Sequence, residues 1–319
     1  MTMGEFEFIE RLLKPLARGY PGALRLGDDA ALVDLPVGHE LVVAKDAMVA
    51  DVHFLADDPA ELVAGKLLRV NLSDLAAMGA EPLGYLTALA RSPAIEDAWL
   101  YRFAAGLMAD QQRFACHLLG GDTVATPGPL MLSLTILGTV PKGQALLRSG
   151  ARAGDDIWVS GTLGDAALGL RTLRGLAVAE EEAMALVDRY RTPRPRLALG
   201  KALRGLATAA IDVSDGLVAD LGHVLKASGV GAVLDASLLP LSAVAHGIPG
   251  AREAALTGGD DYELLFTAPA DRRGAVEGLS GQLDHGLSRI GAVQAEPGCV
   301  VLDECGRALK LDHAGWRHF

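Results

Sequence analysis

The chain of 319 residues has few cysteines, no excess of basic charge and no long apolar run. Its three cysteines, Cys116, Cys299 and Cys305, are unevenly spaced and form no CxxC pair, which argues against a disulfide framework or a zinc site. The net charge of −11 argues against binding to a nucleic acid or an anionic membrane, because both would require a basic face. No run approaches a membrane span, and the N-terminal segment lacks the apolar core of a signal peptide, so we expect a cytoplasmic protein.

Common phosphate-binding and kinase motifs are also missing. The sequence contains no GxxxxGK[ST] loop and no HRD and DFG pair. The stretch GTLGD at 161–165 is rich in glycine, but we expect it to form a tight turn from a strand into a helix. If ATP binds, metal ions rather than a P-loop lysine must neutralise most of its charge.

The length and the mixture of strand and helix patterns predict a mixed α/β protein of two domains. Strand patterns occur at 41–45 and, with clear alternation, at 130–140. Helical patterns cover about 59–79, 96–115, 181–190, 195–207 and 215–228. The span 141–155 is rich in glycine and turn residues, so we expect domains at 1–140 and 141–319.

One carboxylate in the predicted helix 59–79 requires a partner. A period of 3.6 residues puts Asp74 on the stripe of Leu67, Asn71 and Met78, roughly opposite Lys66, Arg69 and Ser73. Asp74 is therefore expected to point inward. A buried carboxylate is costly unless it is hydrogen-bonded, paired with a cation or bound to a metal, and both a core ion pair and a metal ligand are open at this point.

Three further acids follow strand-like stretches. Asp46 ends LVVAKD, Asp122 follows LLGG, and Asp212 lies in AIDVSDG, where Asp215 is expected to open a helix. Each alone is typical of a turn or cap residue. Together with Asp74 they suggest phosphate chemistry, because Mg²⁺ takes oxygen ligands and commonly bridges carboxylates to substrate phosphates.

Eight motifs, in order along nearly the whole chain, resemble the thiamine-monophosphate kinase family, in the superfamily of aminoimidazole-ribonucleotide synthetase and selenophosphate synthetase. They are LGDDAAL, KDAMVADVHF, NLSDLAAMGAEP, LLGGDT, LLRSGARAGD, AIDVSDGL, GGDDYELLF and the terminal GWRHF. The resemblance implies a mixed α/β (α+β) fold of two domains. Domain 1–140 would bind ATP and Mg²⁺ and would contribute its sheet to a dimer barrel, and the α/β domain 141–319 would close over the nucleotide.

The resemblance also implies an activity and a set of site residues. The activity is ATP-dependent phosphorylation of thiamine monophosphate to thiamine diphosphate, the last step of thiamine diphosphate biosynthesis, by in-line transfer in a homodimer. The family's Mg²⁺ ligands fall on Asp29, Asp46, Asp74, Asp122, Asp212 and Asp215. Its ATP contacts fall on Gly120, Gly121, Arg148 and Ser214, and its thiamine-phosphate contacts fall on His53, Glu263 and Trp316.

Elementary chemistry agrees with that implication. Both substrates are phosphate anions, so an acidic protein must bring in several divalent ions to bind them together. The acceptor phosphate is already ionised near neutral pH, so no general base is required. Trp316 and Glu263 have the chemistry to hold a cationic thiazolium ring. Without the resemblance, Trp316 is typical of packing, Glu263 of a solvated strand acid and His53 of an ordinary strand residue.

One departure and two rival functions remain. Many members of the family carry Ser or Thr before the acid at position 46, whereas this chain has Ala44 and Lys45, so Lys45 either replaces one cation or points away.

One rival is a superfamily enzyme with another acceptor, but the reactive cysteines of the selenophosphate and hydrogenase-maturation enzymes are missing. The other is a non-catalytic nucleotide- or metal-sensing module, which the retention of all six acids opposes. Asp28 is expected to hydrogen-bond the turn beside Asp29.

Overall fold

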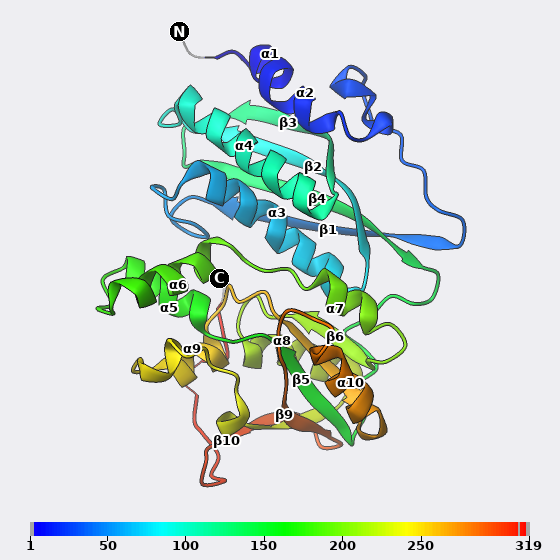
Figure 1. Cartoon of the computed structure of the whole chain (residues 1–319), viewed down its shortest axis with the longest axis vertical. Coiled ribbons are helices and arrows are strands. Elements are labelled where there is room, and N and C mark those ends of the chain that lie inside the picture. Colours follow the sequence, from blue (N-terminus) through cyan, green and yellow to red (C-terminus); the bar gives the residue numbers. More distant parts are fainter. Residues whose placement is uncertain (1–2, 312, 317–319) are drawn as a thin grey trace. The chain divides into compact units, whose positions relative to one another are not determined.

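The computed structural model describes residues 3–311 and 313–316, and the chain divides into two compact units (Figure 1). The first unit contains the chain up to residue 75 and residues 80–143, and the second contains residues 76–79 and everything from 144. Each unit is built on one mixed β-sheet with helices, so the predicted mixed α/β class is confirmed.

The four-stranded sheet of the first unit has the order β1-β4-β2-β3. β1 (His39–Val49) and β2 (Glu81–Arg91) pair antiparallel with β4 (Met131–Pro141), and β3 (His117–Ala125) runs parallel to β2. The alternation predicted for 130–140 is confirmed, because the even-numbered side chains of β4 are buried and most odd-numbered ones face the other side. The predicted strand 41–45 is the middle of a longer strand.

Helices α3 (Ala60–Ala77) and α4 (Asp97–Phe114) lie over one face of this sheet (Figure 1), which confirms the predicted helices 59–79 and 96–115. The two helices approach closely, since a Cβ on Gly106 of α4 would lie 2.3 Å from the carbonyl oxygen of Glu61. Arg69 and Asp110 form an ion pair of 2.6 Å between them.

The predicted inward stripe of α3 is confirmed, because Leu67 and Asn71 are 0% exposed and Asp74 hydrogen-bonds Asp46 of β1, but the prediction that the opposite side of the helix faces outward was wrong. Lys66 and Ser73, expected opposite the buried stripe, are 3% and 0% exposed, whereas Asp74 is only half-buried. The helix is covered on several sides, so a 3.6-residue period cannot distinguish its faces. The Lys66 ammonium keeps a polar partner, because it donates to the carbonyl oxygen of His53.

An N-terminal segment of short helices packs against β3. It comprises α1 (Glu5–Phe8), the π-helix η1 (Ile9–Leu13), α2 (Lys14–Ala17) and the 3₁₀ segment η2 (Pro21–Leu26). Ala17 and Ala23 of this segment form a small core with Leu119 of β3. The segment therefore fixes the start of the loop that carries Asp28 and Asp29.

The six-stranded sheet of the second unit has the order β10-β7-β9-β5-β8-β6. Its strands are β5 (Asp155–Ser160), β6 (Ala209–Asp212), β7 (Gly231–Asp235), β8 (Leu264–Pro269), β9 (Leu287–Gln294) and β10 (Gly298–Leu302). β10 is parallel to β7, and all other pairs are antiparallel. Every residue of the central strand β5 is buried.

The helices of the second unit are α5 (Asp165–Leu173), α6 (Glu180–Arg191), α7 (Leu197–Ala202), α8 (Leu217–Ser228), α9 (Ala251–Thr257) and α10 (Arg273–Ser280), with 3₁₀ turns η3 (Ala236–Leu238), η4 (Ala245–Gly247) and η5 (Ala270–Arg272). The predicted helices 181–190 and 215–228 are α6 and α8. The helix predicted over 195–207 ends early, at Ala202, and the chain then turns through Gly205 at φ +71°.

The predicted role of the GTLGD stretch is confirmed. It connects β5 to α5, and Gly161 and Gly164 adopt φ angles of +58° and +84°, which a residue with a Cβ adopts only with strain. Among the described residues, no helix combines the length and the apolar character needed to cross a membrane.

Candidate active site

A cavity of about 700 Å³ lies in the first unit, over the face of the sheet that carries the odd-numbered side chains Ser133, Thr135 and Leu137 of β4. The loop after the N-terminal segment contributes Asp28 and Asp29 to its lining, and β3 contributes Gly120, Gly121 and Asp122. Four residues predicted to bind metal or ATP, namely Asp29, Gly120, Gly121 and Asp122, therefore line one cavity. Lys45, Ser133 and Thr135 of β1 and β4 also line it.

The second glycine of β3, Gly121, is required by the close approach of β2. A Cβ on Gly121 would lie 2.0 Å from the carbonyl oxygen of Thr87, and the strand register shifts between Tyr85 and Leu86. The two glycines do not end the strand, because the ladder continues from Asp122 opposite Ala88 to Ala125. The prediction that Asp122 follows the strand was therefore wrong. The lack of side chains on the glycines leaves the floor of the cavity open.

The loop before Asp29 is strained. Leu24, Arg25 and Leu26 all have positive φ angles, of 51°, 57° and 52°, in a region that residues with a Cβ rarely adopt. The Asp29 N–H then donates to the Asp28 carboxylate at 3.0 Å, which confirms the predicted structural role of Asp28. Backbone strain concentrates at functional sites, in agreement with a binding role for this loop.

Asp46 and Asp74 meet on the helix-covered side of the sheet. Asp46 lies inside β1, opposite Leu134, so its predicted place at a strand end was wrong. Its side chain hydrogen-bonds that of Asp74 on α3, and its backbone N–H donates to Asn71 Oδ1 at 3.2 Å. Burial raises the pKa of Asp46, although the hydrogen bond with Asp74 and the Lys45 charge act in the opposite direction. The structure thus pairs two of the predicted metal ligands.

His53 lies in the turn after β1 rather than in a strand. Its Nδ1 accepts the Val49 N–H at 3.0 Å, which assigns the proton of a neutral ring to Nε2. The turn is held further by the His53 N–H, which donates to the Val49 carbonyl at 3.0 Å. The imidazole is thus held in one orientation with a donor nitrogen.

The carboxylates of the first unit suit Mg²⁺ by their chemistry. In the described part of the chain, no three or more His, Cys, Asp or Glu side chains are grouped closely enough to hold one ion. Mg²⁺ nevertheless commonly takes one or two carboxylates and completes its shell with water and substrate phosphate. The Asp46–Asp74 pair, and Asp29 with Asp122 in the cavity, match that requirement.

In the second unit, the predicted residue Asp212 ends β6, and Ser214 and Asp215 lie on the loop that follows it. The segment 258–263 runs beside this loop, and its Asp260 and Tyr262 N–H groups donate to the carbonyl oxygens of Ser214 and Val213, each at 2.8 Å. Asp260 and Tyr262 have positive φ angles of 71° and 50°. This strained pair of segments holds the predicted acids in place.

Asp220 is a positioning residue that the sequence reasoning missed. Its Oδ2 accepts the N–H groups of Ser214, Asp215 and Gly216 at 3.0, 3.0 and 3.1 Å. Helix α8 begins at Leu217, so the prediction that Asp215 opens the helix was wrong. The available signal was an acid in the first turn of a helix, where carboxylates satisfy backbone N–H groups that have no intrahelical partner.

Trp316 lies next to the same loop. Its N–H donates to the Asp215 carbonyl at 2.9 Å, and the residue is 55% exposed. Residues 317–319 of the GWRHF motif lie outside the described residues. Arg148 is exposed on a loop whose backbone is held by Ser228, since Ser228 Oγ donates to the Arg148 carbonyl and accepts the N–H of Gly150 at 3.1 Å.

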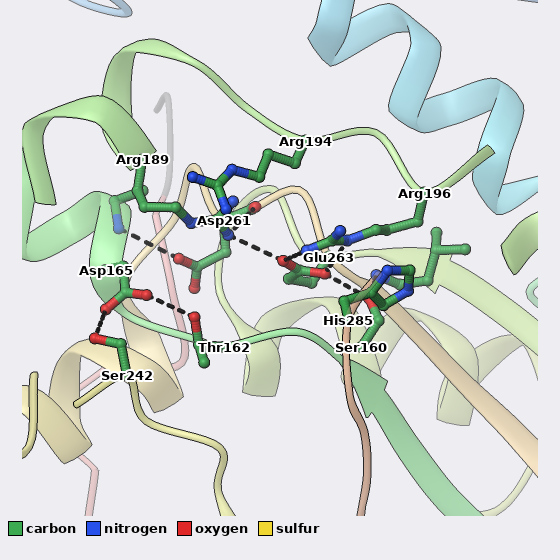
Figure 2. A network of polar contacts seen from close by, with 12 residues as sticks. Ser160, Thr162, Asp165, Arg189, Arg194, Arg196, Ser242, Asp261, Glu263 and His285 are labelled. Atoms are coloured by element: carbon green, nitrogen blue, oxygen red, sulfur yellow. Dashed lines mark hydrogen bonds and ion pairs between the residues drawn. The ribbon is translucent and has the colours of Figure 1, made fainter. Parts of the chain in front are cut away.

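Glu263 is 0% exposed and lies at the centre of an ionic network (Figure 2). Arg196 donates to both of its oxygens at 2.6 Å, Arg189 donates at 3.0 Å, and Ser160 Oγ donates at 2.5 Å. The interpretation of Glu263 as a solvated strand acid was therefore wrong. The negative charge of the Glu263 carboxylate balances the positive charges of the two buried guanidinium groups, those of Arg189 and Arg196.

The same network borders a second cavity, of about 550 Å³, within the second unit. Asp165 lies at its edge and accepts hydrogen bonds of 2.6 Å from Thr162 and from Ser242 (Figure 2). Beside it, burial raises the pKa of Asp261 to about 8, while the carboxylate accepts the Gly164 N–H at 2.7 Å. The three arginines of this cavity, at 189, 194 and 196, come from α6 and the segment that follows it, and no sequence pattern had indicated them.

Comparison with known proteins agrees with the fold. The N-terminal domain model of the AIR synthase related proteins matches residues 27–140, and the C-terminal domain model matches residues 152–304. Together with two mixed α/β units and carboxylates around a cavity, these matches define an AIR synthase-related protein.

Individual relatives match most of the chain. A thiamine-monophosphate kinase of Escherichia coli is 45% identical over 100% of this chain and 99% of its own length. The crystal structure of thiamine-monophosphate kinase from Stenotrophomonas maltophilia is 45% identical, with a TM-score of 0.82, over 89% of this chain and 91% of that one. The structure of AaThiL complexed with AMPPCP and TMP is 32% identical, with a TM-score of 0.79, over 99% and 97%. The chain belongs to the thiamine-monophosphate kinase family.

Proposed function

We propose that this protein transfers the γ-phosphoryl group of ATP to the phosphate of thiamine monophosphate, giving thiamine diphosphate and ADP. The observation that carries the proposal is the cavity of the first unit, where Asp29, Gly120, Gly121 and Asp122 lie together. The full-length similarity to thiamine-monophosphate kinases, one of them complexed with AMPPCP and TMP, names the two substrates.

The chain's own residues supply binding and orientation rather than proton transfer. The side-chain-free backbone of Gly120 and Gly121 admits a phosphate chain close to β3. Asp29, Asp122 and the Asp46–Asp74 pair would hold Mg²⁺, which when bound neutralises phosphate charge and stabilises the charge of the transition state. No general base is needed, because the acceptor phosphate, with a second pKa of about 6, is already ionised at pH 7.

In the second unit we assign Asp212 and Asp215 to Mg²⁺ and Ser214 and Arg148 to the nucleotide. Asp220 fixes Ser214 and Asp215 through their backbone N–H groups. His53 in the first unit and Trp316 in the second are assigned to thiamine monophosphate, the indole because an aromatic face attracts a thiazolium cation. Glu263, also assigned to the substrate side, acts by orienting Arg189 and Arg196, since both of its oxygens already accept hydrogen bonds.

The function is tested by turnover of the purified protein. With Mg²⁺, ATP and thiamine monophosphate, we expect ADP and thiamine diphosphate in equal amounts, measured by chromatography. Slow ATP hydrolysis that ignores thiamine monophosphate would indicate an enzyme with another acceptor. Nucleotide binding without any turnover would indicate a sensing module, and either result contradicts the proposal.

We also propose that the chain forms a homodimer through the open face of the first sheet, and that residues 1–140 are the ATP-binding, Mg²⁺-binding and dimerisation domain. Large apolar side chains outside the lining of the cavity are exposed on strands of this sheet, namely Leu41, Val43, Val124 and Met131. A second copy of the same sheet would cover them, and contiguous exposed apolar side chains mark interaction surfaces.

Val43→Asp tests the dimer. Val43 is 57% exposed on β1, and a carboxylate there would be desolvated in the dimer face, so we expect a monomer in light scattering coupled to size exclusion. The control is Val37→Asp, at an exposed valine in the loop before β1, which is expected to leave the mass unchanged. A monomeric wild-type protein, or a Val43→Asp dimer, would contradict the assignment.

We propose that the reaction takes place in the cytoplasm, because its co-substrate ATP is present there. Cell fractionation that recovers the activity outside the cytoplasmic fraction would contradict this placement.

A further inference from the structure

Lys45 lies in the cavity of the first unit. The side chains of β1 alternate, so that Val42 and Met48 are buried towards the helices while Lys45 faces the open side of the sheet. Among the described residues that line the cavity, Lys45 carries the only basic side chain. Alternation therefore places the ammonium group in the cavity and Asp46 on the opposite face.

Two hydroxyl groups hold the ammonium group. Lys45 Nζ donates to Ser133 Oγ at 2.7 Å and, more weakly, to Thr135 Oγ1 at 3.4 Å, both on the neighbouring strand β4. Ser133 Oγ in turn donates to the Asp46 carbonyl at 2.8 Å, which fixes the orientation of the hydroxyl. Both hydrogen-bond partners of the ammonium group are thus neutral hydroxyl groups, and its charge also acts on the neighbouring Asp46 carboxylate.

The charges that line the cavity are otherwise all negative. Asp28, Asp29 and Asp122 contribute three carboxylates, and Lys45 contributes one ammonium group. A phosphate chain that enters this cavity is repelled by the carboxylates and attracted only by Lys45 and by ions that it brings with it. An ammonium group is a compact charge with three N–H donors, well suited to a phosphate oxygen.

We propose that Lys45 binds a phosphate oxygen of the nucleotide in this cavity and supplies there a positive charge that would otherwise require a further Mg²⁺ ion. The inference rests on the proposed function, because it takes the nucleotide as the ligand of the cavity. It makes Lys45 a binding residue that sets how much Mg²⁺ the protein needs. Ser133 is its positioning residue.

The test is calorimetric titration of the full chain with the non-hydrolysable analogue AMPPCP over a series of Mg²⁺ concentrations. For Lys45→Met we expect the Kd to rise about tenfold or more at low Mg²⁺ and to recover in part at high Mg²⁺, because the ion replaces the lost charge. Lys45→Arg should stay within about threefold of the wild type. Ser133→Ala keeps the ammonium charge but removes a hydrogen bond that positions it. Its Kd for AMPPCP should therefore lie between those of Lys45→Met and Lys45→Arg.

The matched control is Lys142→Met, which removes the same charge from an exposed residue just after β4. If Lys45→Met binds AMPPCP with the affinity and Mg²⁺ dependence of Lys142→Met, the proposal is overturned. Lys45→Gln, a smaller polar change, provides the same comparison should the methionine variant fold poorly, as judged by circular dichroism.

The binding measurement separates this inference from the proposed function. If AMPPCP affinity depends on Lys45 but the wild-type protein makes no thiamine diphosphate, the inference about Lys45 stands and the proposed function is contradicted. If the protein phosphorylates thiamine monophosphate but its nucleotide affinity does not depend on Lys45, the proposed function stands and the inference about Lys45 is contradicted. A wild-type protein that binds no AMPPCP at any Mg²⁺ concentration overturns both.

Discussion

Replacement of Asp74 by asparagine is expected to lower kcat/KM for thiamine diphosphate formation by about a thousandfold while the protein stays folded. Asparagine has the shape of aspartate and can still hydrogen-bond the Asp46 carboxylate that Asp74 contacts. It removes one negative oxygen ligand from the pair, and Mg²⁺ binds charged carboxylates far better than amides. Steady-state kinetics over a range of Mg²⁺ concentrations measure the effect, and circular dichroism checks the fold.

Asp57→Asn is the matched control for this change. Asp57 is an exposed acid in the loop before α3, in the same unit, and its replacement removes the same charge. We expect its kcat/KM to stay within about twofold of the wild type, since exposed substitutions away from a site have small effects. If Asp74→Asn were as active as Asp57→Asn, Asp74 would not be a metal ligand.

The largest effect on stability is expected at Glu263. Glu263→Ala leaves the guanidinium groups of Arg189 and Arg196 buried without their carboxylate, at 8% and 9% side-chain exposure. Removal of one partner from a buried ion pair costs about 3–5 kcal/mol, because the remaining charge stays desolvated. Urea denaturation followed by circular dichroism should show a clear fall in the unfolding midpoint.

Two variants make this measurement specific. Glu277→Ala removes an exposed carboxylate from α10 and should shift the free energy of unfolding by no more than about 0.5 kcal/mol. The double variant Glu263→Leu, Arg196→Met replaces the strongest pair by apolar groups and should recover part of the loss, because a buried ion pair adds little over apolar packing. A Glu263→Ala midpoint equal to that of Glu277→Ala would contradict the structural role of the network.

The sequence predicted those elements whose pattern is local. The alternation along β4 and the long helical periods of α3, α4, α6 and α8 appear in the structure nearly as expected. β1 and β3 were predicted too short, because Asp46 and the glycines before Asp122 were interpreted as strand ends. The glycines and Asp122 lie within β3 because they border a polar cavity. Asp46 lies within β1 because its side chain hydrogen-bonds Asp74 on helix α3.

The sequence could not predict contacts between residues that are distant along the chain. Glu263 lies 67 residues from Arg196 and 103 from Ser160, and no periodicity connects them. The joint lining of one cavity by Asp29 and Asp122 likewise depends on the packing of the N-terminal segment against β3. The assignments of Arg148, His53 and Trp316 came from family resemblance and remain predictions for mutagenesis.

The fate of the γ-phosphoryl group tests the central claim most directly. The purified protein is incubated with Mg²⁺, thiamine monophosphate and ATP that carries a radiolabel in its γ-phosphate, and the products are separated by chromatography. We expect the label to appear in thiamine diphosphate in a one-to-one ratio with ADP, and we expect no labelled product without thiamine monophosphate. Label recovered as inorganic phosphate, at a rate independent of thiamine monophosphate, would contradict it.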